Sequence, residues 1–410
     1  MTAETARAAA EAAARNSYGR LVAYLAARTR NIAAAEDALS DAFAAALDHW
    51  TRDGPPGNPD AWLLTAARRK LIDSGRRAGV RKAAEPDIIR AIEEAESLAA
   101  RESVVDERLN LLLICAHPAI DGGVRTPLML QAVLGLDAAR IASAFLVSPT
   151  AMGQRLVRAK RKIAEARIPF AAPAPHEYGP RSEAVLDAIY AAFGAGYDDV
   201  AGEDGGTDLS QEAIFLAGVA ARLFATNAEA WGLLSLMNFI DARRAARRAD
   251  GRYIPLDRQA TALWDLTRIA AAEETLAQAA RLKLPGRFQI EAAIQSAHVS
   301  ACLTGADTRA AVIRLYDRLL AIAPSTGAEI ARAGAMLKAD RSGEALRALD
   351  AVDQDRVASH QPYWATRAHA LAACGAAKDA AAAFDRAIGL SSDPAARVFL
   401  TEAKAAISAS

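Results

Sequence analysis

Two clusters of basic residues are the features of this sequence whose residue types and spacing could do chemistry. Residues 68–82 contain seven Lys and Arg residues against Asp73 alone, and residues 140–167 contain seven against Glu165 alone. Cations repeated along a segment are what a surface needs to bind the phosphates of a nucleic acid. Each cluster taken by itself fits the solvated face of an ordinary helix equally well.

The formal net charge of zero does not exclude a nucleic-acid partner. The 410 residues include 49 Lys and Arg and 49 Asp and Glu, but residues 1–170 carry a net charge of +4 and residues 171–410 carry −4. Neutrality is therefore a cancellation between two parts of the chain. Prolines gather where the sign changes, and we expect a linker there: Pro169, Pro173, Pro175 and Pro180.

The spacing of apolar residues predicts an all-α protein. Apolar residues recur every three or four positions, as Leu21, Tyr24 and Leu25 do near the N-terminus. Alanine, the strongest helix former, is very abundant, and no segment shows the two-residue alternation of a convincing strand pair.

The second basic cluster lies in a predicted helix-turn-helix. Residues 137–145 indicate a short helix and residues 146–149 a tight turn, with Ser148 as the N-cap and Pro149 as the first residue of a longer helix over 150–162. The second helix of such a motif presents its first turns to bases in the major groove, and its later residues meet phosphates. Other short helical hairpins share this pattern. Its outward residues are predicted to be Thr150, Ala151, Gln154, Arg155 and Arg158.

A weak internal period in the C-terminal part predicts repeated helical hairpins. Ala311, Ala345 and Ala380 are spaced 34 and 35 residues apart. A large apolar residue follows each after four positions, namely Leu315, Leu349 and Phe384. Small residues let paired helices approach while the large residue fills the space between them, as in tetratricopeptide repeats. Alanine-rich helices also produce such matches by chance.

The sequence offers no constellation for catalysis, metal or cofactor binding. The three cysteines are far apart, the six histidines form no ligand-spaced pair, and neither a P-loop nor a dinucleotide-binding motif is present. We therefore expect a protein that is not an enzyme and has no cofactor and no metal. No apolar run reaches 18 residues, so we also expect no membrane span. The absence of a disulfide framework and of an apolar signal segment near the N-terminus indicates a reducing cytoplasm.

Several segments, taken in order, resemble an extracytoplasmic-function sigma factor of bacterial RNA polymerase, of the subgroup with a long helical C-terminal extension. The matching segments are YGRL (18–21), AEDALSDAF (35–43), NPDAWLLTAARRKLID (58–73), DERLNLLLICAHPAI (106–120), IASAFLV (141–147), QRLVRAKRKI (154–163), DARRAAR (241–247) and GRFQIEAAI (286–294). The resemblance implies sigma region 2 at 1–82, a linker at 83–107, sigma region 4 at 108–170 and the extension at 171–410.

The resemblance also implies functional residues in region 2. Its acidic face would contact core RNA polymerase through Asp37 and Asp41, although a solvated face remains the alternative. The loop at 51–59 and the helix from Asp60 would bind the melted minus-ten element. Trp62 would either stack on a base or, as we favour, belong to the core. The cations that would follow the single-strand backbone are Arg68, Arg69, Lys70, Arg76 and Arg77.

Region 4 would place the 150–162 helix in the major groove of the minus-thirty-five element. The predicted contacts to promoter DNA are Thr150, Gln154, Arg155, Arg158, Lys160, Arg161 and Lys162. Arg140 and Gly153 depart from the family pattern, which leaves a sigma-like adaptor or sensor as the alternative function. The charge split further suggests that the acidic extension docks intramolecularly on the basic part.

Overall fold

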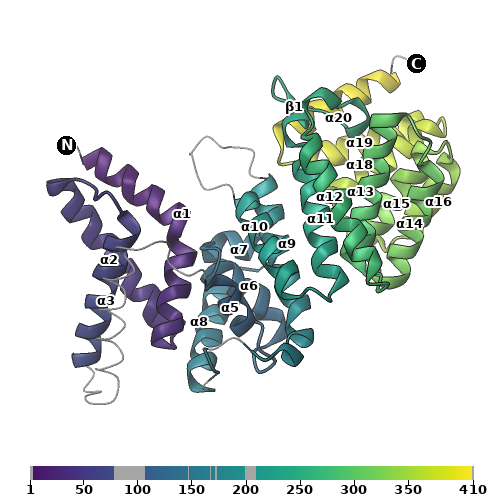
Figure 1. Cartoon of the computed structure of the whole chain (residues 1–410). Coiled ribbons are helices and arrows are strands. Elements are labelled where there is room, and N and C mark those ends of the chain that lie inside the picture. Colours follow the sequence, from purple (N-terminus) through teal and green to yellow (C-terminus); the bar gives the residue numbers. More distant parts are fainter. Residues whose placement is uncertain are drawn as a thin grey trace. The chain divides into compact units, whose positions relative to one another are not determined.

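The computed structural model describes residues 3–77, 107–145, 147–166, 168–170, 173–198 and 209–408 (Figure 1). Helices dominate this part of the chain, which confirms the all-α prediction. The chain divides into two compact units, Met1–Phe224 and Ala225–Ser410. The predicted linker at 83–107, except for its last residue, lies outside the described residues, as do Arg81 and Lys82.

The first unit begins with a bundle of three helices. These are α1 (Ala3–Thr29), α2 (Ile32–Asp53) and α3 (Pro59–Arg77), each of which contacts the other two. Asn31 caps α2, because its side chain accepts a hydrogen bond from the Ala34 amide. Fully buried side chains from all three helices form the core, among them Leu21, Leu25, Leu39, Trp50 and Leu63.

Four further helices form the predicted region 4. They are α5 (Arg108–Cys115), α6 (Gly122–Ala132), α7 (Ala138–Ala144) and α8 (Pro149–Glu165). Helices α7 and α8 are the predicted helix-turn-helix. Ser148 accepts a hydrogen bond from the Ala151 amide at 3.2 Å, and Pro149 opens α8. Both signals read from the sequence are confirmed.

The first unit extends past the predicted boundary near residues 170–180. After the short turn η1 (Pro175–Glu177), α9 (Gly179–Asp198) contacts α5 and α6, and α10 (Leu209–Leu223) contacts α9 and α5. Arg181 in α9 donates a hydrogen bond to the Leu113 carbonyl at 3.1 Å. Arg108 in α5 forms an ion pair with Glu212 in α10. The proline-rich segment therefore lies within one compact unit instead of separating two.

The second unit opens with helices joined by irregular segments. Its first helices are α11 (Ala228–Asp241), α12 (Leu266–Arg281) and α13 (Arg287–Thr304). Between α11 and α12 lie the short turns η3 (Arg244–Ala246), η4 (Leu256–Arg258) and η5 (Thr261–Leu263).

A small antiparallel pair of strands also lies between α11 and α12. The strands are β1 (Arg248–Ala249) and β2 (Arg252–Tyr253). The turn between them has positive φ at Asp250 (50°) and Gly251 (72°). The Asp-Gly pair at this turn is a strong hairpin signal in the sequence.

The rest of the second unit is a series of helices. They are α14 (Arg309–Ile322), α15 (Thr326–Lys338), α16 (Ser342–Asp350), α17 (Gln354–Val357), α18 (Gln361–Ala373), α19 (Ala377–Leu390) and α20 (Pro394–Ser408). These helices pack on their neighbours in the chain, except that α16 packs on α18 past the short α17. The predicted repeat positions Ala345 and Leu349 are buried in α16, and Ala380 and Phe384 are buried in α19. Membership of the tetratricopeptide class stays a prediction.

The second unit contains a histidine that should make its stability depend on pH. Burial lowers the pKa of His298 to about 4, and the cations Lys338 and Arg243 act in the same direction. In the unfolded chain this histidine has an ordinary pKa near 6.5. Between about pH 6.5 and pH 4 the unfolded chain therefore binds a proton at His298 that the folded unit does not bind. Stability is therefore expected to fall as the pH drops from about 6.5 to about 4.

The expected loss is about 1–3 kcal/mol over this range, since one pKa unit corresponds to about 1.4 kcal/mol and solvent screening reduces the effect. Urea unfolding of wild type and His298→Gln across these pH values measures it. The variant should lose less stability on acidification. Equal losses in the two proteins would show that His298 is not the cause.

Candidate nucleic-acid interface

Packing of α8 fixes which of its residues can meet a ligand. A stripe of four buried residues faces the interior: Met152, Leu156, Ala159 and Ile163. All of the predicted DNA-contacting residues of α8 except Lys160 are exposed: Thr150, Gln154, Arg155, Arg158, Arg161 and Lys162. The spacing of the buried stripe thus turns these polar and charged side chains toward solvent.

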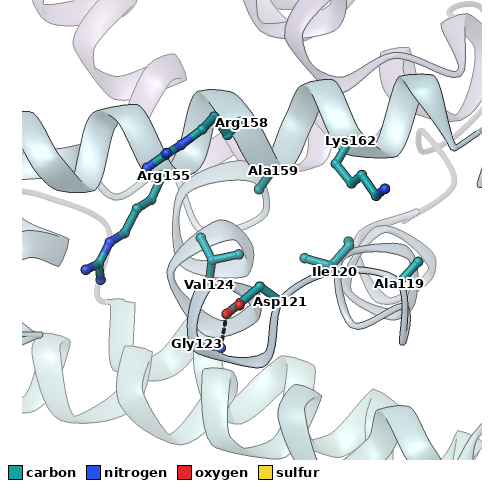
Figure 2. A pocket seen from close by; sticks show the side chains of 9 residues that line it. All are labelled: Ala119, Ile120, Asp121, Gly123, Val124, Arg155, Arg158, Ala159 and Lys162. Carbon is teal, nitrogen blue, oxygen red and sulfur yellow. Dashed lines mark hydrogen bonds between the residues drawn. The ribbon is translucent and has the colours of Figure 1, made fainter.

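Three of the exposed cations line one pocket (Figure 2). Together with residues of the segment 119–124, Arg155, Arg158 and Lys162 of α8 line a cavity of about 570 Å³. In Figure 2 the Lys162 side chain reaches toward Ile120, whereas Arg158 lies along α8 and Arg155 extends away from Ile120. The Asp121 side chain accepts a hydrogen bond from the Gly123 amide at 2.8 Å and so caps α6. No described residue forms an ion pair with any of the three cations, so the pocket suits a phosphate group.

Lys160 points to the opposite flank of α8. Its ammonium lies 2.5 Å from Glu36 Oε2 in α2, and the two side chains are only 11% and 14% exposed. The side chain is thus engaged within the protein. Arg161 lies 3.3 Å from Glu165 on the open surface, where such a pair contributes little stability.

Arg68, predicted to follow a single strand, is buried in the three-helix bundle. Its side chain donates a hydrogen bond to the Tyr24 hydroxyl, and its guanidinium lies 5.1 Å from the centre of the Tyr24 ring. The residue is 9% exposed. Arg68 therefore stabilises the packing of α1 on α3 in this structure and does not face a ligand.

The remaining cations of this cluster are divided between surface and undescribed positions. Arg69 is exposed, and Lys70 is exposed 3.6 Å from Asp41. The side chains of Arg76 and Arg77 lie outside the described residues. Arg69 and Lys70 therefore provide the described positive charge on α3.

The predicted acidic face on α2 lies at the surface. Asp37 and Asp41 are both exposed, one helical turn apart. Asp41 shares the ion pair with Lys70, whereas Asp37 has no ion pair with a described residue. The two carboxylates are accessible to a protein partner.

The start of α3 is anchored to α1. Asn58 caps the helix, because its side chain accepts a hydrogen bond from the Ala61 amide at 3.1 Å. Asp60 lies in the first turn, where it accepts hydrogen bonds from Ser17 and Arg20. Trp62 is half-buried, and its ring lies 5.5 Å from that of Trp50. The indole is therefore partly used in packing, and whether it also stacks on a base stays a prediction.

The described residues contain no group of three or more His, Cys, Asp or Glu that could hold a metal ion. Within the same part of the chain, every helix is too short or too polar to span a bilayer.

The contrast between Arg68 and Arg69 makes a testable prediction. Arg68→Ala removes a buried hydrogen bond and leaves a cavity, so the α1–α3 bundle should lose about 2–4 kcal/mol of stability. The exposed neighbour is the control, since Arg69→Ala should change stability by less than about 0.5 kcal/mol. Hydrogen exchange of peptides from α1–α3 reports this stability locally. Equal effects of the two substitutions would contradict the buried role of Arg68.

Comparison with known proteins identifies two parts of the chain. Residues 15–81 match the family model for sigma-70 region 2. Residues 181–280 match a family of unknown function, DUF6596. No solved structure matches the chain.

A relative matches almost the whole length. The chain is 35% identical over 378 residues to "Uncharacterized protein R00370" from Rhizobium meliloti (strain 1021), which covers 90% of this chain and 89% of the relative. The region 2 match covers the α1–α3 bundle from residue 15 onward, including Asp37, Asp41 and the exposed cations of α3. The chain therefore belongs to the same family as the Rhizobium meliloti protein, and its N-terminal part contains a sigma-70 region 2.

Proposed function

We propose that the protein is an extracytoplasmic-function sigma factor that binds core RNA polymerase and directs promoter-specific initiation of transcription. The observation that carries the proposal is the capped helix-turn-helix α7–α8, with its cation-lined flank, in the same chain as a sigma-70 region 2. The transferase chemistry belongs to the polymerase, so the protein itself is not an enzyme. It acts in the cytoplasm, where its partner is located.

The polar residues of α8 divide into two sets by chemistry. Thr150 and Gln154 lie in the first turns of the helix, and a glutamine can form two hydrogen bonds with adenine in the major groove. Arg155, Arg158 and Lys162 lie along the flank that forms the pocket, where they suit backbone phosphates. Thr150 and Gln154 would provide the preference for particular bases. The three cations would provide most of the affinity for DNA.

In region 2, the exposed residues of α2 and α3 support two contacts. Asp37 and Asp41 offer negative charge to a basic surface of the polymerase. Arg69 and Lys70 offer positive charge to the melted minus-ten strand. Lys70 and Asp41 form an ion pair with each other, so among the described residues Asp37 and Arg69 can make these contacts without breaking a pair.

The two departures from the family pattern were the reason to consider an adaptor or sensor. Arg140 donates a hydrogen bond to the Ala195 carbonyl at 3.3 Å and so links α7 to the C-terminal end of α9. A Cβ atom at Gly153 would meet open space, and glycine costs α8 about 1 kcal/mol relative to alanine. Neither residue distorts the helix-turn-helix, so these two departures do not count against the sigma-factor proposal.

Run-off transcription with purified core polymerase and genomic promoter fragments tests the proposal. The full chain should stimulate transcription from a subset of fragments. Tight binding of polymerase without any transcript would favour the adaptor instead.

The same assay with a chain ending at Phe224 tests a regulatory role for the second unit. Higher activity would support inhibitory docking of residues 225–410, and lower activity would show that they are required. Equal activity would contradict a regulatory role.

Substitutions in α8 should separate base contacts from phosphate contacts. Arg158→Ala should weaken binding to a mapped promoter and to unrelated duplexes alike, and reduce the slope of log K against log salt by about 0.9. Gln154→Ala should cost about 1–3 kcal/mol on the promoter, relax the preference at one base pair and leave the slope unchanged.

Fluorescence titrations at several salt concentrations measure both effects. Arg314→Ala, an exposed arginine of the second unit, is the control and should change neither quantity. Identical behaviour of the two α8 variants would contradict the assignment of separate roles.

A further inference from the structure

We propose that the ion pair between Lys160 and Glu36 is an intramolecular latch that withholds one flank of α8 from nucleic acid. The contact joins the predicted recognition helix to α2, the helix that carries the predicted polymerase contacts Asp37 and Asp41. That the withheld ligand is nucleic acid rests on the proposed function. That the ion pair acts as a latch rests on the contact between the two helices alone.

The ion pair belongs to a packed contact between α1–α2 and α5–α8. Gly19 in α1 touches the backbone after α6 so closely that a Cβ atom there would lie 1.8 Å from the Val133 carbonyl oxygen. The Tyr18 ring lies against Gly135 in the same way, at 3.2 Å from the place of a Cβ atom. At these two places the two groups of helices are in direct contact.

Cys115 in α5 is a natural reporter of this contact. Its thiol is fully buried, and burial raises its pKa. Glu36 and Lys160 are near enough to influence that pKa in opposite directions. Helix α1 packs on α5, so opening of the contact would remove one of the elements that cover this part of the chain.

The chemistry of the ion pair suits a contact that opens. Glu36 Oε2 forms the ion pair with the Lys160 ammonium. The other carboxylate oxygen, Glu36 Oε1, is buried and has no hydrogen-bond partner among the described residues. The Coulomb attraction of a buried pair is largely offset by the lost hydration of both ions. On opening, both ions and the unpaired oxygen regain water, which lowers the free-energy cost of separation.

The geometry of DNA explains what the latch prevents. A helix in the major groove has a phosphate backbone along each of its sides. One flank of α8 carries the open cations Arg155, Arg158 and Lys162, but the other faces α2. There the Glu36 carboxylate occupies the place next to Lys160 where a phosphate would bind. Full seating of α8 in a groove therefore requires the latch to open.

Alkylation of Cys115 by N-ethylmaleimide, followed by peptide mass spectrometry on the full chain, tests the latch directly. Glu36→Gln removes the charge that holds Lys160, so the alkylation rate of Cys115 should rise at least about tenfold. Asp48→Asn, at an exposed position of the same helix, is the matched control and should leave the rate unchanged. Alkylation of the exposed Cys374 serves as the internal reference.

Two further variants separate opening of the latch from unfolding. The charge-swapped double variant Glu36→Lys with Lys160→Glu should restore protection of Cys115, since it rebuilds the pair with reversed signs. Gly19→Ala should expose Cys115 without any change of charge. A Cys115 rate that stays at the wild-type value in both Glu36→Gln and Gly19→Ala would overturn the proposal.

A nucleic-acid experiment tests what the latch withholds. Saturating mixed-sequence duplex DNA at low salt should accelerate Cys115 alkylation in wild type, and Glu36→Gln should bind this duplex at least about fivefold more tightly. Cys115 that stays protected in the DNA-bound chain would overturn the proposal, because binding would then occur with the latch closed. Absence of any DNA binding would instead count against the proposed function, and the variants tested without DNA still decide whether the contact opens.

Discussion

Burial of one apolar stripe on α8 is the constraint on which the rest of the candidate interface depends. Met152, Leu156, Ala159 and Ile163 face the interior, so each remaining position of the helix has a fixed direction. Because this stripe is buried, the polar residues of the first turn are exposed and three cations line one pocket. For the same reason Lys160 faces α2. A shift of the stripe by one position would rearrange all three surfaces together.

The arrangement of the helices determines which of the clustered cations are available to a ligand. In the sequence, seven cations between residues 140 and 167 form one cluster. In the structure, Arg155, Arg158 and Lys162 are available to a ligand, while Lys160 is paired across the first unit and Arg161 is paired locally. Counting charges therefore shows where a phosphate-binding surface lies but overstates how many residues it can use.

The local signals in the sequence were sufficient for the elements but not for their contacts. Ser148 and Pro149 predicted the start of α8, because a cap depends only on neighbouring residues. The burial of Arg68 against Tyr24 and the pairing of Lys160 with Glu36 join residues 44 and 124 positions apart. No local pattern encodes such contacts, so both residues were predicted as nucleic-acid contacts. The contacts that join α9 and α10 to the first unit are not local either, since Arg108 and Arg181 bind partners far away in the chain.

Site-specific photo-crosslinking from position 154 tests the central claim most directly, namely that α8 reads promoter DNA. A photoreactive residue would replace Gln154 in the full chain, which is then bound to core polymerase on a mapped promoter. The account predicts crosslinks to the minus-thirty-five element. Crosslinks confined to protein, in a complex that still binds polymerase and promoter, would contradict it.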